Sequence, residues 1–180
     1  MGTVVIDTSQ LKVSEVPWLQ VLSLRASKMH ASEQGLSTLL APLGLQVPRA
    51  ANALQGNPQR SCSWLEPRAW LLVSESAVQI GKQAHWLITD ISDRVAVFSV
   101  KGEHARPIIA AGCDPHLMRP GTMARTRFGG IANVIVEQWA EADYRLLIDV
   151  SVAGVFAAWL KSAAQNLRSP LNLTKQAGSS

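Results

Sequence analysis

The stretch from Thr122 to Asp149, TMARTRFGGIANVIVEQWAEADYRLLID, decides the fold. It contains three strand-like runs, at Thr122–Phe128, Ile131–Trp139 and Tyr144–Asp149. Gly129-Gly130 separates the first two runs, and paired glycines supply the positive φ angles that a tight hairpin turn requires. Ala140–Asp143 separates the second and third. Because the connections are this short, the stretch predicts three successive antiparallel strands.

More strand-like runs lie on the N-terminal side. Trp18–Leu24 has apolar residues on both sides of its alternation, which favours a strand with both faces covered. Two hairpins are predicted after it: Ser61–Leu65 with Ala69–Ser74, and His85–Asp90 with Arg94–Val100. Pro48–Arg60 is rich in Asn, Gln, Pro and Gly, and predicts an exposed loop.

Three segments have helical spacing. The first has Ser32 as its expected N-cap and Gly44 as its C-cap, and Pro42 in its last turn favours an early end. The second lies within Gly102–Gly112, where Pro107 predicts a late start or a kink. The third follows Ser151 and carries a broad apolar stripe.

Helices interrupt the strands too rarely for a doubly wound parallel sheet. The order therefore predicts an α+β fold with mainly antiparallel sheets and three helices, and two ferredoxin-like halves sharing a sheet fit the count. We expect residues 1–16 to form an N-terminal arm or a peripheral strand, residues 17–167 to form the domain, and residues 168–180 to be a flexible polar tail.

Composition limits the classes of function. The 180 residues include 17 Lys and Arg against 13 Asp and Glu, so the net charge is 17 − 13 = +4. Only Arg119, Arg125 and Arg127 lie close together, so nucleic-acid binding is disfavoured. The longest apolar run, Val152–Leu160, is too short to cross a bilayer. Met1–Gln10 does not resemble a secretory signal, so we expect no membrane association and a cytoplasmic location.

The motifs of four large enzyme classes are absent: G-x-G-x-x-G, G-x-x-x-x-G-K-[ST], G-x-S-x-G and H-E-x-x-H. Cys113 and His116 have the spacing of two zinc ligands, but a zinc site needs three or four. Cys62, His85 and His104 would complete it only if the fold brought them together. A nucleophile and base at Cys113 and His116 is a further alternative, and a buried thiol beside a loop histidine is favoured over both. We therefore predict no catalytic, cofactor-binding or metal-binding residue.

The tryptophans are unusually frequent. The chain has six Trp against one Tyr and three Phe. An indole carries a large apolar area and one hydrogen-bond donor, which suits both cores and protein interfaces. We assign most of them to the core and the remainder to contacts with a partner chain. Arg125 and Arg127 should project from one face of a strand. This face is either solvated or meets acidic groups on another surface. The candidate interface residues are Trp18, Trp70, Trp139, Arg119, Arg125 and Arg127.

The order and spacing of several segments resemble the gamma subunit of heterotetrameric sarcosine oxidase. These segments are Thr89-Asp90-Ile91-Ser92-Asp93, Val95–Gly102, Gly112-Cys113-Asp114, Pro120–Thr126 and Tyr144–Ile148, with Leu19–Arg25 and Trp70–Val73 before them. The likeness covers roughly residues 16–166. The same region is similar to part of the glycine-cleavage T-protein, an aminomethyltransferase, and this implies a related folate-binding fold.

One position departs from the T-protein pattern. In that family an acidic residue after the glycine pair helps to position the folate and the amine, and the matching residue here is Asn133. An amide cannot act as a carboxylate base or counter-ion, which argues against methyl transfer by this chain.

The resemblance implies a non-catalytic subunit of a complex that oxidises sarcosine to glycine, delivers the one-carbon unit to tetrahydrofolate and produces hydrogen peroxide. Its partners would be alpha, beta and delta subunits, chiefly alpha, and these would carry FAD, FMN, NAD and tetrahydrofolate. Alternatives are a stand-alone folate-binding or aminomethyltransferase-like protein, and a subunit of a related N-methyl amino acid dehydrogenase.

Overall fold

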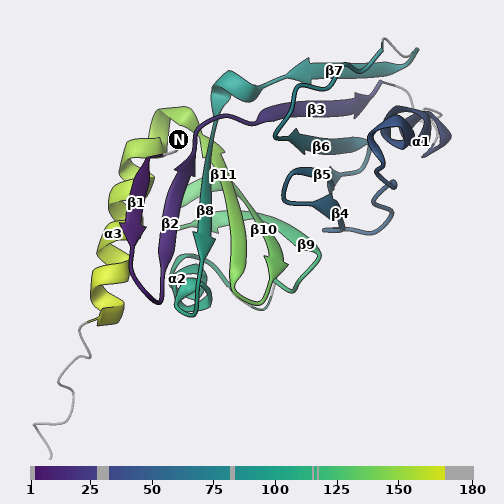
Figure 1. The fold of residues 1–180 in the computed structure, drawn as a ribbon. Helices are drawn as coiled ribbons and strands as arrows, with labels where there is room; N and C mark the ends of the chain where they lie inside the picture. The colour runs from purple at the N-terminus through teal and green to yellow at the C-terminus, as the bar shows by residue number, and fades with distance from the viewer. Residues whose placement is uncertain (1–2, 28–32, 82–83, 115, 117, 169–180) are drawn as a thin grey trace, which may run out of the picture.

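Two antiparallel sheets form the centre of the molecule (Figure 1). The computed structural model describes residues 3–27, 33–81, 84–114, 116 and 118–168. The six-stranded sheet has the order β1 (Val4–Asp7), β2 (Lys12–Val16), β8 (Val95–Lys101), β11 (Asp143–Asp149), β10 (Ile131–Ala140) and β9 (Thr122–Phe128). The five-stranded sheet has the order β4 (Leu54–Asn57), β5 (Arg60–Glu66), β6 (Ala69–Ser74), β3 (Gln20–Ala26) and β7 (Trp86–Asp90).

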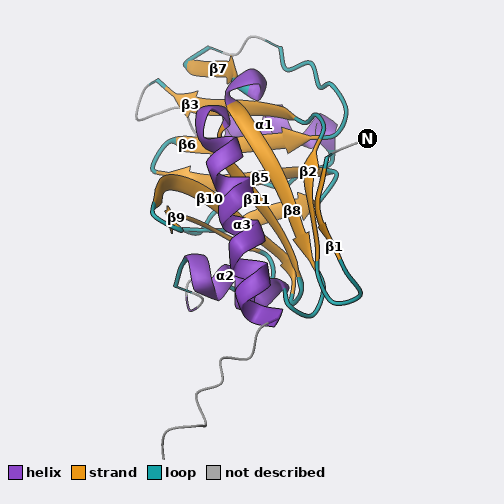
Figure 2. Ribbon diagram, turned by 90° about the vertical axis from the view of Figure 1, so that its left-hand side faces the viewer, coloured by secondary structure: helices purple, strands orange, loops and turns teal. Residues whose placement is uncertain are grey.

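The helices lie on the outer faces of the sheets. Figure 2 shows α2 (Ala105–Gly112) and α3 (Ala153–Arg168) against one face of the six-stranded sheet. The buried leucines of α1 (Glu33–Leu40) pack on the five-stranded sheet. A third apolar cluster joins the inner faces of the two sheets. The predicted α+β fold with antiparallel sheets and three helices is therefore confirmed.

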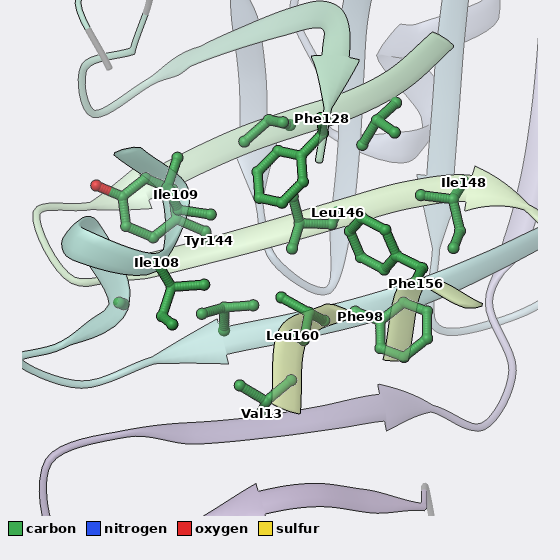
Figure 3. Packing of buried hydrophobic residues seen from close by; sticks show 14 of the residues in the cluster. Val13, Phe98, Ile108, Ile109, Phe128, Tyr144, Leu146, Ile148, Phe156 and Leu160 are labelled. Carbon is green, nitrogen blue, oxygen red and sulfur yellow. The ribbon is translucent and has the colours of Figure 1, made fainter. Parts of the chain in front are cut away.

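The largest core lies beneath α3 (Figure 3). Phe156, Leu160 and Ala164 recur every four residues, so they share one face of the helix. The ring of Phe156 packs against those of Phe98 on β8 and Phe128 on β9, with both centroid distances at 5.4 Å. These aromatic contacts fix α3 on the sheet.

Each sheet contains the same strand order. β3-α1-β4-β5-β6 and β8-α2-β9-β10-β11 both run strand, helix and then three strands, and in both the fourth strand pairs with the first. The chain thus has two similar halves, as predicted. The halves have separate sheets, however, and neither has the ferredoxin-like helix between its third and fourth strands within the described residues. The reason is that β9, β10 and β11 follow one another through tight turns.

The first sixteen residues contain two strands at one edge of the six-stranded sheet, which corresponds to the peripheral strand of the two alternatives. β1 and β2 form a hairpin, and β2 pairs with β8 from Lys12↔Lys101 to Val16↔Val97. Val13 is fully buried in the largest core. The apolar residues here are too few to show a clear period. Their burial results from pairing with β8, a strand distant in sequence, so the local pattern did not predict it.

The predicted hairpin of His85–Asp90 with Arg94–Val100 is wrong. β7 pairs with β3 in one sheet, while β8 pairs with β2 and β11 in the other. The single 3-10 turn Ser92–Arg94 carries the chain from one sheet to the other. The loop predicted at Pro48–Arg60 also contains a strand, β4, which has Leu54 as its one buried residue.

Several local predictions are confirmed. α1 ends at Leu40, and a 3-10 turn containing Pro42 leads to Gly44 at φ 71°. α2 starts late, at Ala105, so Pro107 lies in its first turn, where a missing N–H breaks no helical bond. Gly129 and Gly130 have φ of 56° and 88°, as the hairpin turn requires. The proposed cap Ser32 and the tail from residue 169 lie outside the described residues.

Ser92 controls the acidity of Asp90 at the crossing between the sheets. Its hydroxyl donates to Oδ1 of Asp90 at 2.5 Å and its backbone N–H donates at 2.9 Å, which lowers the pKa of Asp90 below 3.8. A lowered pKa stabilises the fold above pH 3.8, and this stabilisation is lost as the pH falls through the lowered value. Ser92→Ala should raise the pKa of Asp90 toward 3.8 in an NMR titration of its carboxyl carbon.

The matched control is Ser151→Ala. Ser151 makes the equivalent bonds to Asp149 and lowers the pKa of that carboxyl. This variant should raise the pKa of Asp149 and leave Asp90 unchanged. An Asp90 pKa that did not move in Ser92→Ala would contradict the assignment.

Candidate functional site

The inner face of the six-stranded sheet is apolar near β8 and becomes polar toward β9. Val97 and Leu147 meet Val21, Leu71 and Val73 of the other sheet in the apolar cluster between the sheets. Polar residues take over at the same inward positions further along β10 and β11. Two features follow from them: a buried ionic network and an open groove.

Arg145 is the centre of the buried network. Its side chain is 6% exposed and that of Glu137, directly opposite on β10, is fully buried. Nε of Arg145 donates to Oε2 of Glu137 at 2.6 Å. Nη1 donates to the carbonyl oxygen of Pro58 at 2.7 Å, and Nη2 donates to Oγ of Ser61 at 2.6 Å. Arg145 therefore ties the six-stranded sheet to the five-stranded one.

The network is closed to solvent. Burial raises the pKa of Glu137, and the charge of Arg145 opposes that rise. Oε1 of Glu137, Oγ of Ser63 and Nε1 of Trp139 are buried and have no hydrogen-bond partner among the described residues. The carboxylate of Glu137 is fully buried and pairs with Arg145, which in turn bonds to Ser61 and Pro58, so this network holds the two sheets together.

A groove of about 390 Å³ opens beside the apolar cluster. Its floor is apolar, with Val21 and Leu71 from one sheet and Ile135 and Leu147 from the other. Three arginines line it: Arg25 on β3, Arg94 at the end of the 3-10 turn Ser92–Arg94, and Arg125 on β9. An apolar floor with cations at the rim suits a ligand that is both apolar and anionic.

The arginines differ in their partners. Arg25 pairs with Glu66 at 3.0 Å, where both side chains are about half exposed. Among the described residues that line the groove, only Asp149 carries a carboxylate, and its Oδ1 accepts two bonds from Ser151. The side chain of Arg125 makes no ion pair or hydrogen bond with the described part of the chain. Its guanidinium is thus the cation with most capacity for an added ligand.

Asn133 enters the groove through an irregularity in β10. The register with β9 shifts between Ile131 and Val134, which marks a bulge. Asn133 takes φ 61° there, and asparagine tolerates this left-handed conformation better than most residues. Asn133 lines the same groove as Arg125.

The structure separates the six candidate interface residues. Trp18 is 52% exposed, and Arg119, Arg125 and Arg127 are exposed as well. Trp70 is only 8% exposed, since it packs in the core beneath α1, where Nε1 donates to the carbonyl oxygen of Pro48 at 3.4 Å. It has little surface left for a partner.

The structure also gives the positions of Trp139 and of the arginines on β9. Trp139 is half-buried, with the guanidinium carbon of Arg145 at 5.3 Å from its ring centre. Arg125 and Arg127 project from one face of β9, opposite to the buried Ala124 and Phe128, as expected. An interface role for the exposed members remains a prediction.

The cysteines are poor nucleophiles. Burial raises the pKa of Cys62 far above its usual value, and it raises that of the half-buried Cys113 to about 11. Both thiols therefore stay protonated at neutral pH. Within the described residues, no three His, Cys, Asp or Glu side chains gather closely enough to hold a metal ion.

Four site residues were missed from the sequence: Arg25, Arg94, Glu137 and Arg145. A signal existed for two of them. Glu137 and Arg145 occupy inward positions on strands expected to pair across a short turn, so a cross-strand ion pair was open to prediction. Arg25 and Arg94 come from segments that only the packing of the two sheets brings to one groove.

Solved structures share this fold. One chain of the heterotetrameric sarcosine oxidase from Corynebacterium sp. U-96, determined in complex with pyrrole 2-carboxylate, matches with a TM-score of 0.79 and 19% identity. The match covers 91% of this chain and 89% of that one. Aminomethyltransferase T of the glycine cleavage system from Bartonella henselae matches with a TM-score of 0.63 and 10% identity, over 84% of this chain.

The second match covers 45% of the aminomethyltransferase, so the chain spans about half the length of that protein. No family model and no curated protein matches the sequence. At these identities the likeness shows the fold, and it confirms the one that the family resemblance implied. None of the described helices is both long and apolar enough for a bilayer span.

Proposed function

We propose that this chain is a non-catalytic subunit of a heterotetrameric sarcosine oxidase or of a closely related amine-oxidising complex. The observation that supports this most is the near end-to-end match to one chain of such an oxidase, which covers 91% of one chain and 89% of the other. The buried ionic network agrees with it, because its fully buried carboxylate helps to hold the two sheets together.

The identity of residue 133 argues against folate chemistry at the groove. In the aminomethyltransferase pattern an acidic residue helps to position the folate and the amine at the matching position. The nearby Asn133 supplies an amide and not an acid. We therefore assign no folate chemistry to this chain.

In this proposal the redox chemistry belongs to partner subunits. The complex converts sarcosine to glycine, passes the one-carbon unit to tetrahydrofolate and yields hydrogen peroxide. Alpha, beta and delta subunits, with FAD, FMN, NAD and tetrahydrofolate, carry these steps in the cytoplasm. This chain docks chiefly on alpha, and the exposed Trp18 and Arg119 are candidates for the contact.

Co-expression tests the proposal. The chain should copurify with the three partner subunits as one species that produces hydrogen peroxide from sarcosine, and it should have no such activity alone. Trp18→Ala, at a 52% exposed side chain, should weaken copurification, whereas the control Leu87→Ala, at a 59% exposed one on β7, should not. Sarcosine oxidation by the isolated chain, or its elution apart from the partners, would contradict the proposal.

A stand-alone folate-binding protein is the second candidate, and the likeness to aminomethyltransferase T favours it. It predicts that the purified chain binds tetrahydrofolate at micromolar concentration and that substitution of Asn133 abolishes binding. The first candidate predicts no binding in the same titration.

A further inference from the structure

We propose that the groove between the sheets receives an extended segment of a partner chain in which acidic and apolar side chains alternate. This inference rests on the proposed function, because it states what part of a partner subunit the chain recognises. Three properties of the groove support it: its charge, its length and the position of Asn133.

The groove carries more positive than negative charge, which favours binding of an external anion. Arg25, Arg94 and Arg125 contribute three positive charges, while the groove itself holds only the carboxylate of Asp149. Glu66 compensates Arg25 from outside, and Arg94 lies close enough to lower the pKa of Asp149. Arg125 remains uncompensated among the described residues. A carboxylate at Arg125 would gain charge-assisted hydrogen bonds that the chain itself does not supply.

The length of the groove favours a chain segment over a small anion. Val21 and Arg25 both line it and are four residues apart on β3, which is about 13 Å along an extended strand. Arg94 lies at the Val21 end, because Ile91 donates its N–H to the carbonyl oxygen of Val21. An extended peptide places alternate side chains on one side about 6.6 Å apart. Because its successive side chains point to opposite sides, the apolar ones can cover the floor while the acidic ones lie on the open side, where the arginines form the rim.

Asn133 makes the site specific for a carboxylate. Its amide can donate a hydrogen bond to an anion bound by Arg125, and it adds no competing negative charge. The left-handed φ of 61° is equally accessible to aspartate, so Asn133→Asp changes the charge of the groove with little change in shape.

The test uses the full chain and two labelled peptides of six residues. One alternates glutamate with leucine, and the other has glutamine in place of each glutamate. Fluorescence anisotropy should show saturable binding of the acidic peptide, with the glutamine peptide at least about tenfold weaker. Arg125→Gln and Asn133→Asp should each weaken binding of the acidic peptide about tenfold.

Arg127→Gln is the matched control. Arg127 is exposed on the same strand two residues from Arg125, but it does not line the groove, so this variant lowers the net charge equally and should change binding less than twofold. If Arg125→Gln and Arg127→Gln weakened peptide binding equally, net charge alone would explain the loss and the proposal would be overturned. Equal binding of the two peptides, or none at millimolar concentration, would overturn it as well.

Glutarate, a free dicarboxylate, tests whether the groove binds a small anion or the carboxylates of a partner segment. If it binds at Arg125 while the acidic peptide does not, the groove takes a small molecule and the proposed partner segment is wrong. If the peptides fail but the chain still copurifies with its oxidase partners, only this inference falls and the proposed function stands.

Discussion

Replacing Arg145 with methionine is expected to lower the free energy of unfolding by about 3–5 kcal/mol. The substitution removes the cation that faces a fully buried Glu137, and it leaves that carboxylate with no partner in a medium of low polarity. It also frees Oγ of Ser61 on β5 and the carbonyl oxygen of Pro58 in the turn between β4 and β5. Denaturation by urea, followed by tryptophan fluorescence, measures the loss.

Two comparisons separate the buried charge from lost packing. The double variant Arg145→Met with Glu137→Leu should recover most of the stability, because an apolar pair can replace a buried ion pair at little cost. Arg106→Met breaks the pair with Glu141, where both side chains are more than half exposed, and should cost under about 1 kcal/mol. An Arg145→Met variant no less stable than Arg106→Met would show that the network does not hold the sheets together.

Gly102→Ala is expected to lower the free energy of unfolding by about 3–5 kcal/mol. Gly102 has φ 110°, and an added Cβ would lie 2.4 Å from the carbonyl oxygen of Gln10. That oxygen accepts the N–H of His104 at 3.0 Å, so it cannot move away freely. Thermal unfolding followed by circular dichroism measures the effect.

Gly121→Ala is the control for backbone conformation alone. Gly121 has φ 79°, but no atom lies within 4 Å of its added Cβ. This variant should therefore cost only about 1–2 kcal/mol. If both variants lost the same stability, the close approach at Gln10 would not be the cause.

Sequence alone predicted features that depend on neighbouring residues. The strands β9, β10 and β11 and the turn at Gly129-Gly130 were predicted because apolar alternation and paired glycines are local signals. The late start of α2 followed from Pro107, which acts within its own turn.

Features that depend on distant pairing were missed. The runs that became β7 and β8 look like two arms of a hairpin, and nothing in their alternation reveals that they belong to different sheets. The groove was not predicted for the same reason. Arg25, Arg94 and Arg125 share a groove only after the sheets pack, and Trp70 is an interface candidate until α1 and Pro48 cover it.

The strand order of the six-stranded sheet also constrains when it can form during translation. Val13 pairs with Val100, so the ribosome must add 87 residues before β2 meets its partner, on the order of 4–17 s at usual elongation rates. β11 lies between β8 and β10, yet it is the last of the strands to be made. The strands of the five-stranded sheet are all made before residue 91. The nascent chain can thus complete that half first, while the early hairpin waits until β8, which ends at Lys101, has been made.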